Sequence, residues 1–550
     1  MKPLPVALAA ALLTACGGSD VPPDAARADV TTDASADAVT DAADVADAPP
    51  ANRVTAITTG GPVIGFEQNG VTIFHRIPYA APPTGVLRFR PPSPADPWIT
   101  PLDATGAGSV CAQGSSLLGI SGPSGVEDCL HVNVTTPGLS GSRPVMVWIH
   151  GGGFVVGSGS ESSYEGTRLA TEGDVVVVTV NYRLGALGFL AHPSLASATE
   201  TTGNWGFLDQ QAAVRWVQAN AARFGGDPAR ITLFGESAGG TSVALHAVAP
   251  GSRGLFARAI VQSGPAPRLP SRERANAIGQ LAAQALGCTT DVARCLRAAD
   301  PFRLQAAVTG TSEPGGIFYQ ERGFVYLPTF DGVTFPEQPL AVLRAGRGSD
   351  TPMILGTNTN EASIFHGGLI GTPVTTEAQY QAALGRAVNV LGITPAQAAM
   401  IGARYPSSRY PSPNDALMAV TTDGLFACAA RYVARAQQAA GRPVRLYRFD
   451  QEPGRVLLPG LGVFHAAELS FVWGTMGGLL GDSSSAPALG TAMRGYWTRF
   501  AATGDPAGSP AWPLWSPTAD NRLRLAVPVS VEPANPDARC DFWSGLYDTL

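Results

Sequence analysis

The sequence predicts an α/β protein in which a large, mainly parallel central sheet is flanked by helices and carries long loop insertions. Six short runs rich in Val, Ile and Leu follow one another, and such continuous apolar runs are typical of strands buried on both faces of a parallel sheet. Helical patterns separate them, the clearest over 208–224, which ends at Gly225. Apolar residues fill 45% of the 550 positions, enough for an extensive core. The predicted strands cover residues 145–150, 175–183, 231–237, 259–264, 352–358 and 444–450.

The chain begins with a segment typical of exported proteins. Lys2 precedes an apolar run over 4–13, which is too short to span a bilayer and therefore predicts a cleaved signal peptide over 1–16. The sequence Leu-Thr-Ala-Cys at its end resembles a bacterial lipobox, which implies a lipid on Cys16. An ordinary signal peptide with an incidental cysteine is the alternative. We expect a protein of the bacterial cell envelope that is anchored to a membrane by this lipid, at the outer membrane or cell surface, or that is secreted.

Residues 17–52 are predicted to be a disordered acidic linker. They contain eight aspartates and one arginine within an alanine-rich segment that has no apolar pattern to support folding. Residues 53–550 are predicted to form one domain. Lys2 contributes one positive charge and the linker a net seven negative charges, so the total charge of -6 leaves this domain neutral. It therefore has no basic excess that would attract nucleic acid.

The residue inventory excludes several kinds of chemistry. Lys2 is the only lysine among 37 basic residues, so the chain has neither a phosphate loop ending in GK[ST] nor a Schiff-base lysine in its folded part. It also has no H-E-x-x-H motif, no close cysteine pair suited to zinc and no dinucleotide-binding fingerprint. We expect no metal and no cofactor.

Ser237 is the predicted nucleophile. It is the central residue of GESAG (235–239), a G-x-S-x-G motif that directly follows a predicted strand and precedes the helix-like stretch 241–249. Glycines on both sides permit the sharp turn that exposes the hydroxyl, and the N-terminus of the helix favours developing negative charge. A glycine-rich turn with an idle serine is the alternative.

A serine nucleophile needs a base, and histidine is the natural candidate in a chain almost without lysine. The chain order Ser, then Asp or Glu, then His leaves two candidates after Ser237, His366 and His465. His366 lies only five residues beyond the best acid, whereas His465 lies in a loop after the last predicted strand. We predict His465 as the base, and we expect His246, on the helix after the nucleophile, to be a packing residue.

Glu361 is the predicted acid. It follows the strand 352–358 on a polar turn, and side chains that face a ligand collect at the carboxyl ends of strands in such sheets. There its carboxylate would hold the tautomer of His465 and stabilise the imidazolium. A solvent-exposed glutamate is the alternative.

Backbone amides for an oxyanion are expected from the glycine-rich segment HGGGF (150–154), which directly follows the first predicted strand. The expected donors are the N–H groups of Gly152, Gly153 and Ala238. A phosphate-binding loop is the rival interpretation, but this segment lacks a lysine and a following helix.

These segments together resemble the type-B carboxylesterases, the family that includes the cholinesterases, over nearly all of residues 54–550. The resemblance implies the α/β-hydrolase fold and hydrolysis of carboxylic esters through an acyl-enzyme intermediate, with Ser237, Glu361 and His465 as the catalytic triad. It also suggests that Glu236, Ser263 and Glu468 support the histidine, although ordinary hydrogen bonding would explain them nearly as well. The matching motifs, in order, are IPYAAPPTGVLRFRPP, EDCLHVNV, HGGGF, NYRLGALGFL, GNWGFLDQQAAVRWV, ARFGGDP, FGESAGG, VQSG and WTRFAATGDP.

Six cysteines remain if Cys16 carries the lipid, and an even number in an exported protein indicates three disulfides. The residues alone permit fifteen pairings. The family resemblance implies one of them, in which the last pair closes the longest loop and stabilises the fold most, by about 4–5 kcal/mol in the chain-entropy account. The implied pairs are Cys111–Cys129, Cys288–Cys295 and Cys428–Cys540.

The chain departs from the family pattern at several positions. Between Cys111 and Cys129 it has no Trp, Tyr or Phe, whereas cholinesterases carry there the Trp that receives a quaternary ammonium. Choline esters are therefore not expected as substrates. Arg76 replaces a usual Gly and His131 a usual Tyr, changes that affect local packing.

Two alternatives to ester hydrolysis stay open. The chain could be a non-catalytic binding or adhesion protein that keeps an intact triad, or an amidase or thioesterase on the same fold. The expected partner is a small-molecule ester, and membrane contact is expected only through the N-terminal lipid anchor. The sequence leaves the physiological substrate, the acyl and alcohol sizes and the oligomeric state open.

Overall fold

The computed structural model describes residues 52–115, 122–196, 202–265, 268–308, 325–366, 372–391, 393–455, 460–475, 481–532 and 538–550. Residues 1–51 lie outside this set, and with them the predicted signal peptide, Cys16 and almost the whole predicted linker. None of the described helices combines the length and the apolar character that crossing a bilayer requires.

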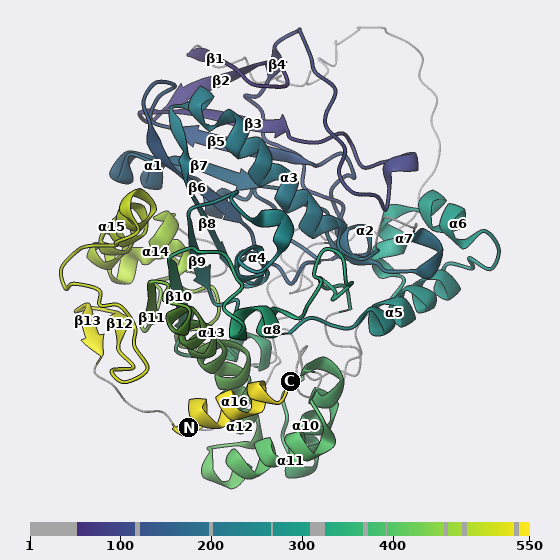
Figure 1. Cartoon of the computed structure of the whole chain (residues 1–550), viewed down its shortest axis with the longest axis vertical. Helices are drawn as coiled ribbons and strands as arrows, with labels where there is room; N and C mark the ends of the chain where they lie inside the picture. Colours follow the sequence, from purple (N-terminus) through teal and green to yellow (C-terminus); the bar gives the residue numbers. More distant parts are fainter. Residues whose placement is uncertain are drawn as a thin grey trace, which may run out of the picture. The chain divides into compact units, whose positions relative to one another are not determined.

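The described strands form one thirteen-stranded sheet with a parallel centre (Figure 1). Seven neighbouring strands run parallel to one another. In spatial order they are β7 (Val176–Val180), β6 (Arg143–Ile149), β8 (Gly226–Glu236), β9 (Arg258–Gln262), β10 (Met353–Asn358), β11 (Val444–Phe449) and β12 (Arg522–Leu525). All six predicted strands are therefore confirmed, as is the α/β-hydrolase architecture with its mainly parallel sheet.

Antiparallel strands, which the sequence did not predict, extend both edges. On one side β5 (His131–Thr136) pairs with β7 and leads to β3 (Val71–Pro78), β2 (Pro62–Gln68) and β1 (Arg53–Ile57). A short strand, β4 (Leu102–Asp103), pairs with β2, and β13 (Ser530–Glu532) closes the other side. Strand β1 alternates between exposed and less exposed residues, so it lacks the continuous apolar run that revealed the central strands.

Alternate residues of β6 show how both faces of the sheet are buried. Val145, Val147 and Ile149 belong to one apolar core, while Met146 and Trp148 belong to another. The first core includes residues of α3 (Trp205–Asn220), α4 (Ala238–His246) and α13 (Cys428–Ala439). The second includes residues of α1 (Thr167–Gly173), α14 (Leu469–Trp473) and α15 (Pro487–Thr503) (Figure 1). This two-sided burial explains why the central strands read as unbroken apolar runs.

The predicted helix over 208–224 corresponds to α3 and a following 3₁₀ turn over Ala221–Phe224. The turn ends at Gly225, whose φ of 72° is the left-handed conformation that glycine adopts most easily. This termination agrees with the prediction. Strand β8, which leads to the nucleophile, begins directly after this glycine.

The long insertions are largely helical. One group comprises α2 (Gly185–Phe189), α5 (Arg272–Ala285), α6 (Val292–Ala298), α7 (Pro301–Ala306) and α8 (Pro339–Arg344). A second comprises α9 (Ser363–His366), α10 (Glu377–Leu391), α11 (Pro395–Arg404), α12 (Pro413–Thr421) and α16 (Ala538–Asp548). Residues of α10, α11, α12, α13 and α16 share a third apolar core.

All three implied disulfides are present. Cys111–Cys129 and Cys288–Cys295 close short loops, while Cys428–Cys540 joins α13 to α16 across 112 positions. Because the entropy lost by an unfolded chain grows with loop length, this last bond contributes most to stability, about 5 kcal/mol in the chain-entropy account.

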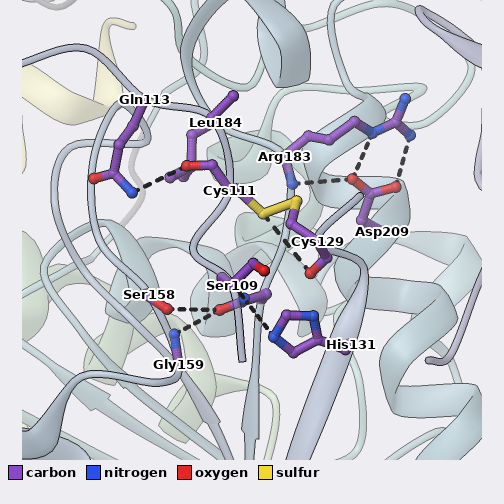
Figure 2. The surroundings of a disulfide bond; sticks show 12 residues. Ser109, Cys111, Gln113, Cys129, His131, Ser158, Gly159, Arg183, Leu184 and Asp209 are labelled. Atoms are coloured by element: carbon purple, nitrogen blue, oxygen red, sulfur yellow. Dashed lines mark hydrogen bonds and ion pairs between the residues drawn. A yellow bond between two sulfur atoms is a disulfide. The ribbon is translucent and has the colours of Figure 1, made fainter. Parts of the chain in front are cut away.

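The departures from the family pattern at Arg76 and His131 are accommodated locally. Arg76 adopts a φ of 46°, a conformation that glycine takes more easily, where the pairing of β3 with β5 shifts register. His131 is buried beside the first disulfide, with its Nε2 3.0 Å from the side-chain nitrogen of Asn181 (Figure 2). The amide N–H can only donate, so this ring nitrogen accepts. Burial lowers the pKa of His131 to about 4, so the ring is neutral.

Candidate active site

Ser237 occupies a strained turn between β8 and α4. Its φ of 57° and ψ of -121° lie outside the common regions for a residue with a side chain, at a cost on the order of 1–3 kcal/mol. Two backbone hydrogen bonds hold the turn, because Ser237 N donates to Gln262 O (3.0 Å) and Thr241 N donates to Ser237 O (2.8 Å). The predicted helix begins directly after the serine, at Ala238. Ser237 is partly exposed, as a nucleophile must be.

Gly239 shows why the motif needs glycine. A Cβ atom at this position would lie 1.9 Å from the carbonyl oxygen of Ile149, at the end of β6. Backbone atoms cannot move aside as a flexible side chain can, so any larger residue would push α4 away from the sheet. The close approach of α4 to β6 places the nucleophile beside the segment that follows β6.

Glu361 and His465 meet on loops that follow neighbouring strands, β10 and β11. His465 Nδ1 lies 2.7 Å from Glu361 Oε2, and both side chains are buried. The loops are joined through Asn360, whose backbone N donates to Val463 O (2.9 Å) and whose Oδ1 accepts from Val463 N (3.0 Å). The predicted acid and base are therefore in contact, although they are 104 positions apart.

The other ring nitrogen of His465 lies at the nucleophile turn. Nε2 is 3.1 Å from Oε1 of Glu236, the residue before Ser237, but the two atoms are not aligned for a hydrogen bond. Among the described residues, no hydrogen bond joins the Ser237 hydroxyl to His465. Such contacts are often long without substrate and shorten when it binds. The rings of Phe365 and Phe426 pack against the imidazole, with centroids at 5.0 and 5.2 Å.

Three buried carboxyl groups surround this one imidazole, and they shift its protonation. Burial raises the pKa of Glu236 to about 8 and also raises the pKa of Glu468. Burial lowers the pKa of His465, but the charges of Glu236 and Glu361 outweigh it, aided by the Glu361 hydrogen bond, and raise this pKa to about 9. An imidazolium at this position is therefore well stabilised.

These shifts predict the pH dependence of a reaction that uses His465 as base. The base must be neutral to accept a proton, so kcat/KM should fall as the pH is lowered through its pKa, with a midpoint above 6.5. Assays of an ester substrate between pH 5 and 10 would measure this midpoint. A rate that stays flat from pH 8 to 5 would contradict the assignment.

No other histidine can produce that midpoint. Burial lowers the pKa of each of the six others, to about 4 or 3 where the ring is most buried. His366, the rejected base, is buried with its Nε2 3.0 Å from the Thr421 hydroxyl. His246 packs against Phe207 with tilted rings whose centroids are 4.5 Å apart, as expected of a packing residue.

The glycine-rich segment after β6 lies against the nucleophile. A Cβ atom at Gly151 would be 3.2 Å from the Cβ of Ser237. Gly152 has a φ of 99°, and a Cβ there would lie 2.1 Å from Val156 O, so only glycine fits. Within the described part of the chain, no backbone carbonyl accepts the N–H groups of Gly152, Gly153 or Ala238. These three predicted donors are thus free to bind an oxyanion.

The three supporting residues that the family resemblance suggested differ in their surroundings. Glu236 lies beside His465, as described, and Glu468 accepts from the side chain of Asn358 (2.6 Å). Ser263 is buried with a φ of 50°, and its hydroxyl has no hydrogen-bond partner among the described residues. Its role stays a prediction. Asn358 itself was missed, although it begins the polar turn that identified Glu361.

Within the described residues, no group of three or more His, Cys, Asp or Glu side chains is arranged so that it could hold a metal ion.

Known proteins resemble this chain over most of its length. A sequence profile described as "Carboxylesterase family" matches residues 51–543. The chain is 37% identical over 494 residues to a para-nitrobenzyl esterase of Bacillus subtilis (strain 168), covering 86% of this chain and 95% of that protein. It is 34% identical over 532 residues to an acylcarnitine hydrolase of Mus musculus, covering 90% and 92%. It is also 34% identical over 556 residues to an acetylcholinesterase of Electrophorus electricus, covering 88% and 86%.

Solved structures give the same result. A PNB esterase structure superimposes with a TM-score of 0.77 at 35% identity, covering 89% of this chain and 99% of that one. A thermophilic PNB esterase gives a TM-score of 0.76 at 34% identity, with the same coverage.

Proposed function

Because the chain belongs to the carboxylesterase family, it is a carboxylic ester hydrolase, and we propose that Ser237, Glu361 and His465 are its catalytic triad. The observation that carries this proposal is the 2.7 Å contact between His465 Nδ1 and Glu361 Oε2, with Nε2 directed to the turn that holds Ser237. The strained backbone at Ser237 supports it, since such conformations gather at active sites.

The proposed reaction is a two-step acyl transfer. His465 Nε2 accepts the proton of Ser237 Oγ while that oxygen attacks the ester carbonyl carbon, and the carbonyl oxygen becomes an oxyanion. As this intermediate collapses, the imidazolium gives its proton to the departing alcohol and leaves an acyl-enzyme. Water, deprotonated by the same imidazole, then attacks the acyl carbon. As this second intermediate collapses, the imidazolium returns its proton to Ser237 Oγ, and the acid is released.

The backbone N–H groups of Gly152, Gly153 and Ala238 stabilise the oxyanion in both steps. Loss of one such donor typically removes about 3 kcal/mol of transition-state stabilisation. Glu361 fixes the tautomer of His465, with the proton on Nδ1, and its charge stabilises the imidazolium. Glu236 lies close enough to add to this charge stabilisation when it is ionised.

We further propose esters of uncharged alcohols as the substrate class. The relatives are named for p-nitrobenzyl esters, acylcarnitine and acetylcholine. Between Cys111 and Cys129 this chain lacks an aromatic side chain that could bind a quaternary ammonium, so it is closer in this respect to an esterase for neutral esters. The N-terminal pattern up to Cys16 supports export and lipid anchoring as part of the same proposal.

A fluorophosphonate probe tests the proposed nucleophile directly. We expect covalent labelling of Ser237 by the folded protein, located by peptide mass spectrometry, because the probe reacts with serines activated by a base. Heat-denatured protein is the control and should stay unlabelled. A folded chain whose Ser237 stays unlabelled would instead favour the non-catalytic binding protein.

A panel of p-nitrophenyl esters of rising acyl length would then map the substrate class. Matched choline, amide and thioester substrates belong in the same panel. We expect the neutral oxygen esters to be cleaved fastest, and a higher kcat/KM for the amide or thioester would reassign the reaction.

A further inference from the structure

A buried chain of hydrogen bonds lies behind the proposed triad. Trp497 Nε1 donates to Gln262 Oε1 at 3.0 Å, and Gln262 Nε2 donates to Glu468 Oε1 at 3.1 Å. The three side chains come from three elements, since Trp497 is on α15, Gln262 ends β9 and Glu468 precedes α14. Each is 0% exposed, so water does not compete for these bonds.

The chemistry of the groups fixes the direction of this chain. An indole N–H can only donate, so the Gln262 amide must turn its oxygen toward Trp497. Its NH₂ group then faces Glu468. Without the indole N–H, nothing in this contact would prevent the amide from turning its oxygen toward the carboxyl group.

Glu468 therefore receives N–H donors on both of its oxygens. Gln262 Nε2 donates to Oε1, and Asn358 Nδ2 donates to Oε2 at 2.6 Å. Two such donors favour the ionised carboxylate, because a protonated carboxyl would direct its own hydrogen at one of them. Burial and the charge of Glu361 act in the opposite direction and raise the pKa of Glu468, so the two donors oppose the loss of its charge.

Asn358 connects this carboxylate to the triad. Its backbone N donates to Glu361 Oε1 at 2.8 Å, and its Nδ2 also donates to the carbonyl oxygen of Phe464, the residue before His465. The charge of Glu468 favours the imidazolium form of His465. Besides His465, the titratable groups around Glu468 are Glu236 on β8, Glu361 after β10, Tyr447 on β11 and Tyr164.

We propose that Gln262 and Trp497 are positioning residues for ester hydrolysis: the indole N–H orients the amide, and the amide keeps Glu468 ionised behind His465. The inference rests on the proposed triad. In this proposal Gln262, which follows three apolar residues at the end of β9, keeps a negative charge near the imidazolium that forms in the transition state.

The test compares pH profiles of kcat/KM for Gln262→Met and Trp497→Phe with the unmodified chain. Each variant removes the donor to Glu468 or the group that orients it, so less negative charge should face His465. We expect the acid-limb midpoint to move to lower pH, by about 1 unit in Gln262→Met and by less in Trp497→Phe. We also expect kcat at the optimum to fall about 10-fold in Gln262→Met.

Matched controls separate this effect from general loss of packing. Gln437 is equally buried and donates to Met353 Sδ at 3.0 Å, and buried Trp543, in the third apolar core, donates from Nε1 to the Tyr405 hydroxyl at 2.8 Å. Gln437→Met and Trp543→Phe remove comparable bonds away from Glu468, so their midpoints should not move.

A double variant shows whether the effect passes through Glu468. Glu468→Gln should lower the midpoint by itself, and adding Gln262→Met should produce no further shift. A midpoint that stays or rises in both Gln262→Met and Trp497→Phe, with the unmodified chain active, would overturn the inference. If Gln262→Met does not fold, Trp497→Phe decides. Absence of fluorophosphonate labelling in the unmodified chain would instead remove the triad on which the inference rests.

Discussion

Replacing Ser237 with alanine should lower kcat for ester hydrolysis by about 10⁵–10⁶-fold. In serine hydrolases that use a triad, loss of the nucleophile removes the whole covalent route and leaves only the contribution of the oxyanion donors and of substrate binding. The fold should survive, because alanine has the same Cβ atom as serine, so the strain at φ 57° does not increase. Steady-state assays of a p-nitrophenyl ester, with the melting temperature measured in parallel, would test both expectations.

Ser242 provides a matched control for this variant. It lies on α4, the helix that begins directly after Ser237, is fully buried, and its hydroxyl donates to Ala238 O at 2.9 Å. Ser242→Ala removes a hydroxyl five residues from the nucleophile but none of the proposed catalytic groups, so kcat should change by less than about 10-fold. If Ser237→Ala kept more than about a hundredth of the activity in a purified sample, Ser237 would not be the nucleophile.

The centre of the fold was predictable because its signal is local. Strand β6 buries consecutive residues on opposite faces, and both faces meet helices, so every position after Arg143 is apolar. The edge strands lack that signal. The residues of β1 alternate in exposure, and its pairing with β2 depends on contacts that no short window of sequence contains.

The candidate site also combines features with a local signal and features without one. The turn at Ser237 and the glycine segment at Gly152 each depend on neighbouring residues of one short motif, so the motif alone identifies them. The meeting of Glu361 with His465 depends on two loops joined through Asn360, and the sequence indicated it only through the chain order and the position of each residue after a predicted strand. The pairing of the cysteines came from family resemblance.

Supporting contacts at the site could not be predicted from local pattern. Trp497 and Gln262 are 235 positions apart, and they meet because α15 packs beside the parallel sheet. The available signal at Gln262 was a polar residue directly after the apolar residues 259–261 of a predicted strand. For Phe426, which packs on the imidazole, the sequence offers no such signal, since a phenylalanine in a helical region is ordinarily a core residue.

Changing Glu361 to glutamine should lower kcat by about 10⁴-fold although the side chain keeps its size. Glu361 Oε1 accepts from the backbone N–H of Asn358, which can only donate. The glutamine must therefore place its oxygen there, and its NH₂ group then faces His465 Nδ1. That nitrogen has to accept, so the ring proton moves to Nε2, and the atom that should take the proton of Ser237 already carries one.

Glu468→Gln is the comparison that isolates this tautomer effect. It removes another buried carboxylate near the same imidazole, but no hydrogen bond joins Glu468 to His465, so the tautomer is unaffected and kcat should fall only about 10-fold. Nitrogen-15 NMR of the His465 ring would report the tautomer directly, with the proton on Nδ1 in the unmodified chain above its pKa and on Nε2 in Glu361→Gln. Equal losses of kcat in the two variants, with unchanged ring spectra, would mean that Glu361 acts through its charge alone.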